Sequence, residues 1–453
     1  MKRFIQTLKN IWSIEDLRKR ILYTIGLVLI YRIGCYVMLP GVDPDPEKLA
    51  AFRDKGDSGL MGLLNMFSGG AFSNASIFAL GIMPYITASI VIQLLVMVVP
   101  KFQKMQREGE SGRRKMNQIT RWLTVAVTAA QAPAYITNMA SQLGASPEAF
   151  HPFTGAAPSA LFWVSSIIIL ISGTLFVMWL GERITDKGVG NGISLLIMIG
   201  IIARLPFALS GEFATRMNQS GSLVMFLVEI IVLLVVILLV ILLVQGTRRI
   251  PVQYAKRIVG NKQYGGVRQY IPIKVNAAGV MPIIFAQAIM FLPITFMGFS
   301  DNTDSSFAIA FSDYNGFWYN LVFFILVVVF TYFYTAIAIN PNQMADDMKK
   351  NGGFIPGVKP GRKTAEYLES ILSKVTLPGS VFLAIVAILP AIIRLFGVTS
   401  QFAQFYGGTS LLILVGVILD TLQQIESHLL MRHYDGLTKT GRIKGRTSMA
   451  IQA

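Results

Sequence analysis

The chain has 453 residues, of which 53% are hydrophobic and only 14% are charged, and its mean hydropathy is +0.57. A soluble protein of this length needs more charged residues, because its surface must face water. The formal net charge at pH 7 is +16, which is a strong excess of Lys and Arg. This composition excludes an ordinary soluble protein and indicates a polytopic membrane protein.

The first 20 residues form a basic, amphipathic segment ahead of the first long apolar run. No small-residue cleavage site follows that run, so we expect residues 1–20 to be a mature cytosolic segment and not a signal peptide. The one cysteine, Cys35, lies inside the first apolar run, which excludes a disulfide framework. We interpret Cys35 as a small packed residue.

Apolar runs of bilayer-spanning length follow one another along the whole chain. The run at 222–244 is broken only by Glu229, whereas the others contain glycines, prolines and polar residues that lipid would penalise unless protein covers them. Most of the helices should therefore pack inside a bundle. The ten expected spans lie near residues 21–39, 76–99, 119–141, 159–181, 189–209, 222–244, 274–297, 317–339, 375–396 and 408–431.

The charges of the connecting segments agree with this number of spans. Most of the 40 Lys and Arg residues lie in the amino-terminal segment, in every second connection and in the basic tail at 432–453. The connections on the other side of the membrane carry more acids than bases. By the positive-inside rule, we expect both termini in the cytoplasm.

The stretch from Leu60 to Leu95 has features that a helix built only to span lipid does not need. Leu60 to Phe67 reads as an apolar helix too short to cross a bilayer, and it is followed by the flexible pair Gly69-Gly70. The next apolar helix carries Pro84 near its start and Gln93 deep inside it. A short helix, a glycine hinge and a kinked spanning helix together indicate a movable stopper beside a passage.

Two long connections, at 246–274 and 340–374, are basic and rich in turn-forming residues. Topology alone does not require loops of this length, so we interpret them as a docking platform for a partner with a phosphate backbone or an acidic surface. Ordinary cytosolic connectors are the alternative. The candidate docking residues are Arg248, Arg249, Lys256, Arg257, Lys359 and Arg362.

Motifs of known catalytic sites are missing from the sequence. It contains no HExxH, no GxSxG and no cysteine pair, and no GxxxxGK[ST] loop for a nucleotide. We therefore expect no enzyme, no metal and no cofactor, and energy must come from a partner.

An ion-coupled transporter of small solutes is the main alternative function, because it needs ionisable groups near the middle of the membrane. The spans offer few candidates for such a group, among them Arg32, Glu229, Asp420 and Glu426. We expect structural roles for the first three: Arg32 pairing with another helix, Glu229 reaching toward the outer surface, and Asp420 capping or bridging helices. A lipid scramblase or a purely structural membrane protein ranks third.

Several long motifs resemble the SecY family, the channel subunits of the protein translocase. The similarity extends from the first span to the tenth and implies an all-α SecY fold of ten transmembrane helices. In this fold two inverted, pseudo-symmetric halves, here 21–209 and 210–431, enclose an hourglass pore. The sequence itself shows no convincing internal repeat. The motifs are SIFALGIMPYITASIVIQLL at 76–95, WLGERITDKGVGNGISLL at 179–196, NMFSGGA at 65–71, EGESGRRK at 108–115, YAKR at 254–257, IPIKVNAAGVMP at 271–282 and YGGTSLLI at 406–413.

The resemblance assigns roles to matching positions. A β-branched apolar ring can close around an unfolded chain without offering it hydrogen bonds, and dewetting there opposes ion leak. The ring implied at the waist is Ile82, Ile86, Ile197, Ile284 and Ile413. The plug implied at 60–72, with its hinge, includes Leu60, Leu63, Leu64, Met66, Phe67, Gly69, Gly70 and Phe72.

The resemblance also implies a lateral gate between the second, third, seventh and eighth spans. Thr87, Gln131 and Asn276 match polar gate positions, and Gln93 continues the stripe of Ile82 and Ile86. Hydrogen bonds between such groups are worth about 0.6 kcal/mol on average in membranes, weak enough for a signal helix to displace. The alternative is that Gln93 and Gln131 only hold helices together.

As a member of this family, the protein would move unfolded polypeptides across, or laterally into, a bacterial plasma membrane. The partners implied are SecE and SecG subunits, the SecA motor, the ribosome, signal sequences, nascent polypeptides and membrane lipids. Two departures stand out. Lys359 replaces the arginine that is usual in the family and loses its planar, bidentate fork, and Glu229 is unusual for the family.

Overall fold

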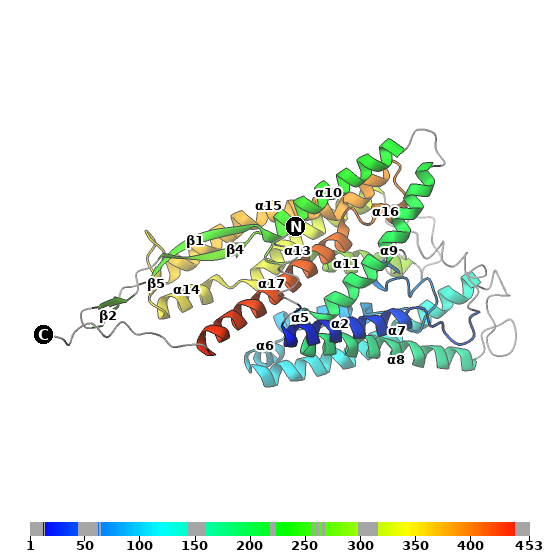
Figure 1. Ribbon diagram of the computed structural model, residues 1–453, viewed down its shortest axis with the longest axis horizontal. Helices are drawn as coiled ribbons and strands as arrows, with labels where there is room; N and C mark the ends of the chain where they lie inside the picture. Colours follow the sequence, from blue (N-terminus) through cyan, green and yellow to red (C-terminus); the bar gives the residue numbers. More distant parts are fainter. Residues whose placement is uncertain are drawn as a thin grey trace.

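The computed structural model describes residues 12, 14–43, 62, 65–143, 160–217, 223–254, 257–259, 262–264, 268–297 and 316–439. Long helices lie side by side in an elongated bundle (Figure 1), and each overlaps one of the predicted apolar runs. They are α2 (Glu15–Gly34), α5 (Met83–Val98), α7 (Glu110–Leu143), α8 (Ala160–Lys187), α9 (Gly192–Met217), α10 (Leu223–Gln245), α11 (Met281–Met297), α13 (Phe317–Ala338), α15 (Arg362–Arg394) and α17 (Gly408–Lys439).

Six helices in the described part of the chain are long and apolar enough to cross a membrane by themselves: α8, α9, α10, α13 continued by α14, α15 and α17. The bent pair of α5 and α6 (Pro100–Arg107) raises the number to seven. The helix α11 is only 17 residues long, and α2 begins with the charged sequence EDLRKR. Multiple membrane crossings are therefore supported, and the predicted ten are consistent with the helices present.

The helix α5 begins later than its apolar run predicts. The run was expected from residue 76, but residues 76–82 form turns and one isolated bridge, from Ser76 to Met38. Gly81 has a φ of +52°, a left-handed conformation that interrupts a helix. Pro84 then occupies the first turn of α5, where its missing N–H costs nothing.

Helix packing divides the bundle into two groups. In the first, α2, α5, α7 and α8 pack on one another, and in the second, α10, α11, α13, α15 and α17 do so. The helix α9 connects them, because it packs on α2 and α8 and also on α10, α16 (Ser400–Ala403) and α17. Among the described residues, α5 and α7 make no extensive contact with α11 or α13. The expected boundary between halves at residue 209 falls inside α9, which continues to Met217.

A small sheet extends from one end of the bundle, where the sequence suggested only turn-rich loops. The strand β1 (Thr247–Tyr254) pairs antiparallel with both β4 (Arg268–Lys274) and β5 (Gly353–Phe354). A second ribbon pairs β2 (Arg257–Val259) with β3 (Lys262–Tyr264). Ile250 and Val252 of β1 turn inward, which is the alternation expected of a strand with one buried face.

Candidate functional site

Isoleucines from the start of α5, from α9 and from α17 lie in one apolar cluster of buried residues. Ile82, Ile197 and Ile413 are 3%, 6% and 6% exposed, and Ile86 packs partly buried against the same cluster. Ile82 and Ile86 come from the start of α5, Ile197 from α9 and Ile413 from α17. The structure thus brings four of the five predicted ring residues together.

The fifth predicted ring residue, Ile284 on α11, lies outside this cluster in the described part of the chain. Its side chain is only partly buried, whereas its neighbour Ile283 is fully buried in a second cluster with α10, α13 and α15. The face of α11 that carries Ile283 therefore packs against the other helices of the same half.

The described part of the predicted plug packs directly on the isoleucine cluster. Met66, Phe67 and Ala71 belong to the same cluster as Ile82, Ile197 and Ile413. Phe72 points into a neighbouring cluster, where its ring meets Tyr135 edge to face at 4.9 Å. Leu60, Leu63 and Leu64 lie outside the described residues.

Two side chains of α2, and that of Cys35 directly after it, contact the end of the predicted plug. Arg32 donates from Nη1 to the carbonyl oxygen of Gly69 at 2.8 Å, and the Tyr31 hydroxyl donates to that of Ser68 at 3.3 Å. The fully buried Cys35 thiol lies 3.8 Å from the same Ser68 oxygen, which confirms Cys35 as a packed residue. Arg32 was expected to pair with another helix, but it binds the backbone of Gly69 in the predicted plug hinge.

Both hinge glycines have left-handed backbone conformations, with φ of +66° at Gly69 and +93° at Gly70. Residues with a Cβ rarely adopt these angles. A Cβ on Gly69 would also lie 2.8 Å from the Cα of Gly200 on α9. Glycine is therefore required at residue 69 both for the turn and for the close approach to α9.

The polar residues predicted at the gate are not bonded to one another. Thr87 donates to the carbonyl oxygen of Met83, and Gln93 to the hydroxyl of Ser89 at 3.5 Å, so both bonds stay within α5. Gln131 is exposed on α7, and the buried Oδ1 of Asn276 has no hydrogen-bond partner in the described structure. The polar groups of Thr87 and Gln93 thus face their own helix.

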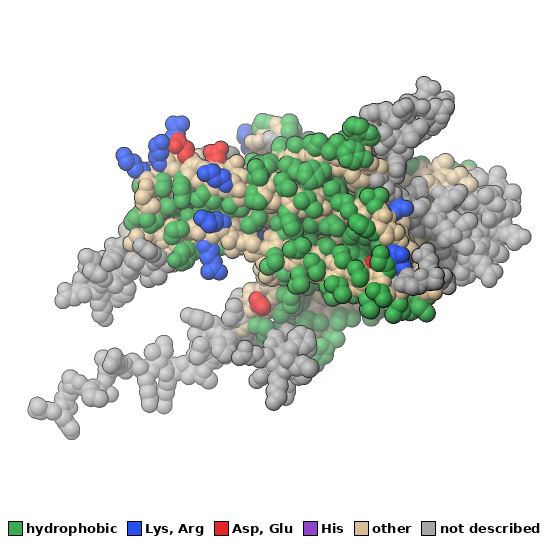
Figure 2. Space-filling view, turned by 90° about the horizontal axis from the view of Figure 1, so that it is seen from above, with side chains coloured by type: hydrophobic (Ala, Val, Ile, Leu, Met, Phe, Trp, Pro, Cys, Tyr) green, Lys and Arg blue, Asp and Glu red, His purple; other side chains and the backbone are tan. Residues whose placement is uncertain are grey.

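The predicted docking loops form one folded unit, in which β5 and α14 (Pro341–Lys350) of the second loop join β1 and β4 of the first. Their core includes Ile250, Val252, Ile273, Met348 and Leu368. Arg248, Arg249, Lys359 and Arg362 are exposed, and Lys and Arg side chains gather at this end of the molecule (Figure 2). Lys256 lies outside the described residues, and only the backbone of Arg257 is described, in β2.

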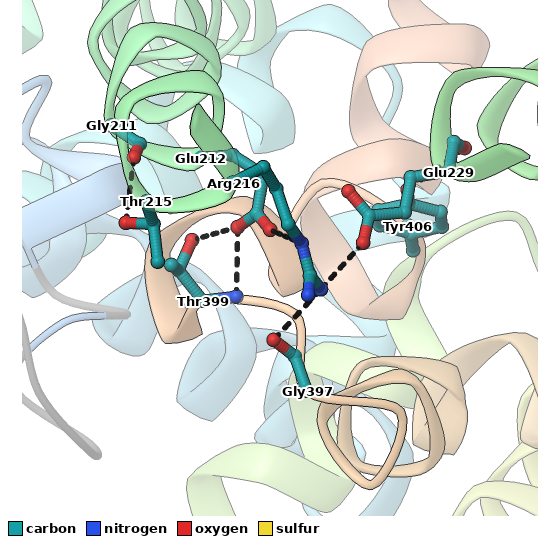
Figure 3. Close-up of polar contacts among 8 residues, drawn as sticks. All are labelled: Gly211, Glu212, Thr215, Arg216, Glu229, Gly397, Thr399 and Tyr406. Carbon is teal, nitrogen blue, oxygen red and sulfur yellow. Dashed lines mark hydrogen bonds and ion pairs between the residues drawn. The ribbon is translucent and has the colours of Figure 1, made fainter. Parts of the chain in front are cut away.

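A buried ion-pair network at the opposite end was missed by sequence reasoning. Arg216 donates from Nε to Glu212 at 2.9 Å and from Nη2 to Glu229 at 2.6 Å (Figure 3). The expectation that Glu229 reaches toward the outer surface is therefore wrong, since it is 8% exposed and paired. The four-residue spacing of Glu212 and Arg216 on one helix was the available signal. Asp420 is exposed on α17.

The chain is similar to known proteins over most of its length. The family model described as SecY matches residues 76–422. The protein translocase subunit SecY of Streptomyces scabiei is 44% identical over 430 residues, which cover 94% of this chain and 97% of that protein.

Solved structures show the same fold at lower sequence identity. A SecY structure described for its plug domain superposes with a TM-score of 0.62 at 18% identity, over 94% of this chain and 95% of that one. Sec61 in a canine ribosome-channel complex gives a TM-score of 0.57 at 17% identity, with the same coverage. The mainly helical two-half fold predicted from the sequence is therefore confirmed.

Proposed function

The chain belongs to the SecY family, and from this we infer that it is the protein-conducting channel subunit of a translocase. It is a multi-pass membrane protein that moves unfolded polypeptides across a membrane or releases them sideways into lipid. The membrane is the bacterial plasma membrane, with both termini in the cytoplasm, as the charge asymmetry of the loops supports. The halves 21–209 and 210–431 meet within α9, which continues to Met217.

The waist of the channel is the isoleucine ring, formed by Ile82, Ile86, Ile197 and Ile413 with Ile284 completing it from α11. Support comes from the convergence of four of these side chains from α5, α9 and α17. An apolar ring offers no polar group to a passing backbone, and it excludes water when it closes. A wide range of sequences can therefore pass through one seal.

The plug, residues 60–72, closes the channel above this ring. Its contact with the ring cluster through Met66 and Phe67 supports this role, as do the bonds from Tyr31 and Arg32. When the plug leaves this position, a few hydrogen bonds and an apolar contact are broken. An entering polypeptide replaces the apolar contact with its own side chains.

The lateral gate opens between α5 and α7 on one side and α11 and α13 on the other. The packing of α5 on α7 in one group of helices, and of α11 on α13 in the other, supports this position. The unpaired Asn276 oxygen is available to a helix that enters the gate. Thr87, Gln93 and Gln131 line the other side.

The unit of β1, β4, β5 and α14 receives the partners that deliver and drive the polypeptide. Its exposed cations suit a ribosome or an acidic motor surface such as SecA. The similarity in fold to Sec61 in a ribosome-channel complex supports the ribosome as one partner. SecE and SecG are the remaining subunits, and the apolar helix faces contact them or lipid.

The channel itself catalyses no reaction, and its energy comes from these partners. An ion-coupled transporter is less compatible with the contacts of its few intramembrane charges. Arg32 binds the plug backbone and Glu229 binds Arg216. Neither charge is therefore placed to bind and release a coupling ion.

The convergence of the isoleucines is the observation that carries this proposal, and conductance tests it. Replacing Ile86 and Ile284 together with glycine should open the waist and raise the ion conductance of the resting channel in planar bilayers. A variant that is folded and inserted but conducts like the native protein would remove the isoleucine ring from the mechanism.

A further inference from the structure

The carboxyl end of α9 lies in a buried polar network that the channel mechanism above does not use. Glu212 is fully buried and accepts from Arg216 Nε through Oε1, and from the backbone N–H of Thr399 at 2.8 Å through Oε2. The Thr399 hydroxyl donates to the same Oε2 atom. One carboxylate thus takes three donors from two segments (Figure 3).

Arg216 connects this carboxylate to two further segments. Its Nη2 donates to Glu229 on α10 at 2.6 Å and to the carbonyl oxygen of Gly397 at 2.9 Å. The hydroxyl of Tyr406, a residue just before the start of α17, donates to the backbone oxygen of Glu229 at 2.8 Å. One guanidinium therefore links the end of α9, the first half of α10 and the connection between α15 and α16.

The network resists being opened. The side chains of Arg216 and Glu229 are both 9% exposed and that of Glu212 is 0% exposed, so water screens the ion pairs little. Removing one partner of a buried pair leaves an uncompensated charge, which is strongly unfavourable. The segments that meet here should therefore stay together when the channel moves.

The position of the network in the fold determines which relative movement of the two halves it restricts. The helix α9 packs on α2 and α8 in one half of the molecule, while α10, Gly397 and Thr399 belong to the other. The helices α5 and α7 make no extensive contact with α11 or α13 in the described structure. The two halves are thus tied at one side and loosely joined at the other.

We propose that Arg216, held between Glu212 and Glu229, is a clamp that fixes the pivot of the channel and confines separation of the halves to the gate side. This inference rests on the proposed channel function. Arg216 is distant in sequence from the ring and plug residues, and it acts on them through α9. It is therefore a positioning residue.

The helix α9 transmits the effect of the clamp to the seal. It carries Ile197 in the ring cluster and Gly200, whose backbone lies against that of Gly69 in the plug. If the end of α9 is free to shift relative to α10, both of these contacts shift with it. The resting channel then leaks even though every ring and plug residue is still present.

The test compares conductance with stability in the purified channel complex, reconstituted in planar bilayers. Arg216→Met keeps the length of the side chain but removes its charge and its donors, and it should raise resting conductance several-fold. Glu229→Gln and Thr399→Val weaken single contacts of the network and should raise it less. Thermal unfolding is measured for each variant in the same detergent.

Arg121→Met is the matched control. Arg121 binds Glu182 through Nε and Nη2 at 3.1 and 2.6 Å, but this pair joins α7 to α8 within one half. Its loss should leave resting conductance at the native level. If Arg121→Met leaks as much as Arg216→Met, general loosening explains the leak and the clamp is refuted.

The other possible results of the conductance and unfolding measurements also test the clamp. If Arg216→Met lowers the unfolding temperature but conducts like the native protein, the network is only structural and the clamp is wrong. If Arg216→Met does not assemble, the graded conductance of Glu229→Gln and Thr399→Val decides in its place. The double variant with Ile86 and Ile284 replaced by glycine is the positive control. If this variant leaks but the clamp variants do not, the clamp alone is refuted. If neither this variant nor the clamp variants leak, the proposed seal is refuted.

Discussion

The backbone of Gly69 in the proposed plug lies against the backbone of Gly200 in α9. A Cβ built on Gly200 would lie 3.1 Å from both the Gly69 nitrogen and the Phe67 oxygen, and one on Gly69 would lie 2.8 Å from the Gly200 Cα. Only two glycines allow this contact without a shift of either segment. We therefore expect the resting position of the proposed plug to depend on its contact with α9, the helix that also carries Ile197.

Gly200→Ala should displace the plug from α9 by a few tenths of an ångström, and Gly200→Val should displace it further. The neighbours of the new side chain are backbone atoms, which cannot rotate away. We expect resting conductance to rise in the order glycine, alanine, valine.

Gly211→Ala provides the control for helix propensity. Gly211 lies on the same helix with no atom within 4 Å of an added Cβ. Its replacement should stabilise α9 slightly, by up to about 1 kcal/mol, and leave conductance unchanged. Equal conductance of Gly200→Val and the native channel would show that the plug does not depend on this contact.

Arg32→Met should loosen the plug from α2, because it removes the donor to the Gly69 oxygen. A hydrogen bond from a charged group is worth about 1.5–3 kcal/mol, enough to raise the population of a displaced plug by tenfold or more. The measurement is the rate at which a membrane-impermeant thiol reagent labels Phe67→Cys, with and without Arg32→Met.

Arg113→Met, an exposed position on α7, serves as the control in the labelling experiment. The buried Cys35 remains in every variant and provides the background rate. The same labelling rate with and without Arg32 would mean that this bond does not hold the plug.

Leu368→Ala should weaken docking although it changes no charged residue. Leu368 is fully buried in the core that joins β1, β4, α14 and α15, and such truncations typically cost about 2–5 kcal/mol. We expect lower affinity for the ribosome or motor in a binding assay with membrane vesicles. Leu377→Ala, at a 57% exposed position of the same helix, should bind normally. If both variants bind alike, the docking surface does not depend on this core.

Arg257→Glu should block export while the protein stays inserted and folded, because it reverses a charge in the proposed docking loop 246–274, where Arg257 lies in β2. Export of a secretory protein into inverted vesicles measures the effect, and Arg257→Lys should largely preserve it. Normal export by the Arg257→Glu variant would remove this residue from the docking site.

The helices and the central cluster could be predicted from the sequence because both depend on local patterns and on long matching motifs. Apolar runs of bilayer length marked each long helix, and Ile82, Ile86, Ile197 and Ile413 belong to or pack against one apolar cluster. The late start of α5 depended on the left-handed turn at Gly81, which apolar composition does not reveal.

Contacts between distant segments were the part that could not be read from the sequence. Arg32 was expected to bind a helix, but its partner is a carbonyl group, which every residue possesses. The partner of Glu229 is Arg216, 13 residues away in the sequence, and Arg216 also binds the distant carbonyl group of Gly397. The strands β1 and β4 were hidden by basic residues on their exposed face, although Ile250 and Val252 alternate as a buried strand face does.

The central claim is that a polypeptide passes through the isoleucine cluster, and site-specific photocrosslinking from Ile86 tests it most directly. A photoreactive amino acid at this position, in a complex with a secretory chain stalled in transit, should crosslink to the translocating chain in high yield. The same probe at Val98, 79% exposed at the far end of α5, should not. No crosslink from Ile86 while the chain is demonstrably stalled in the membrane would contradict the account.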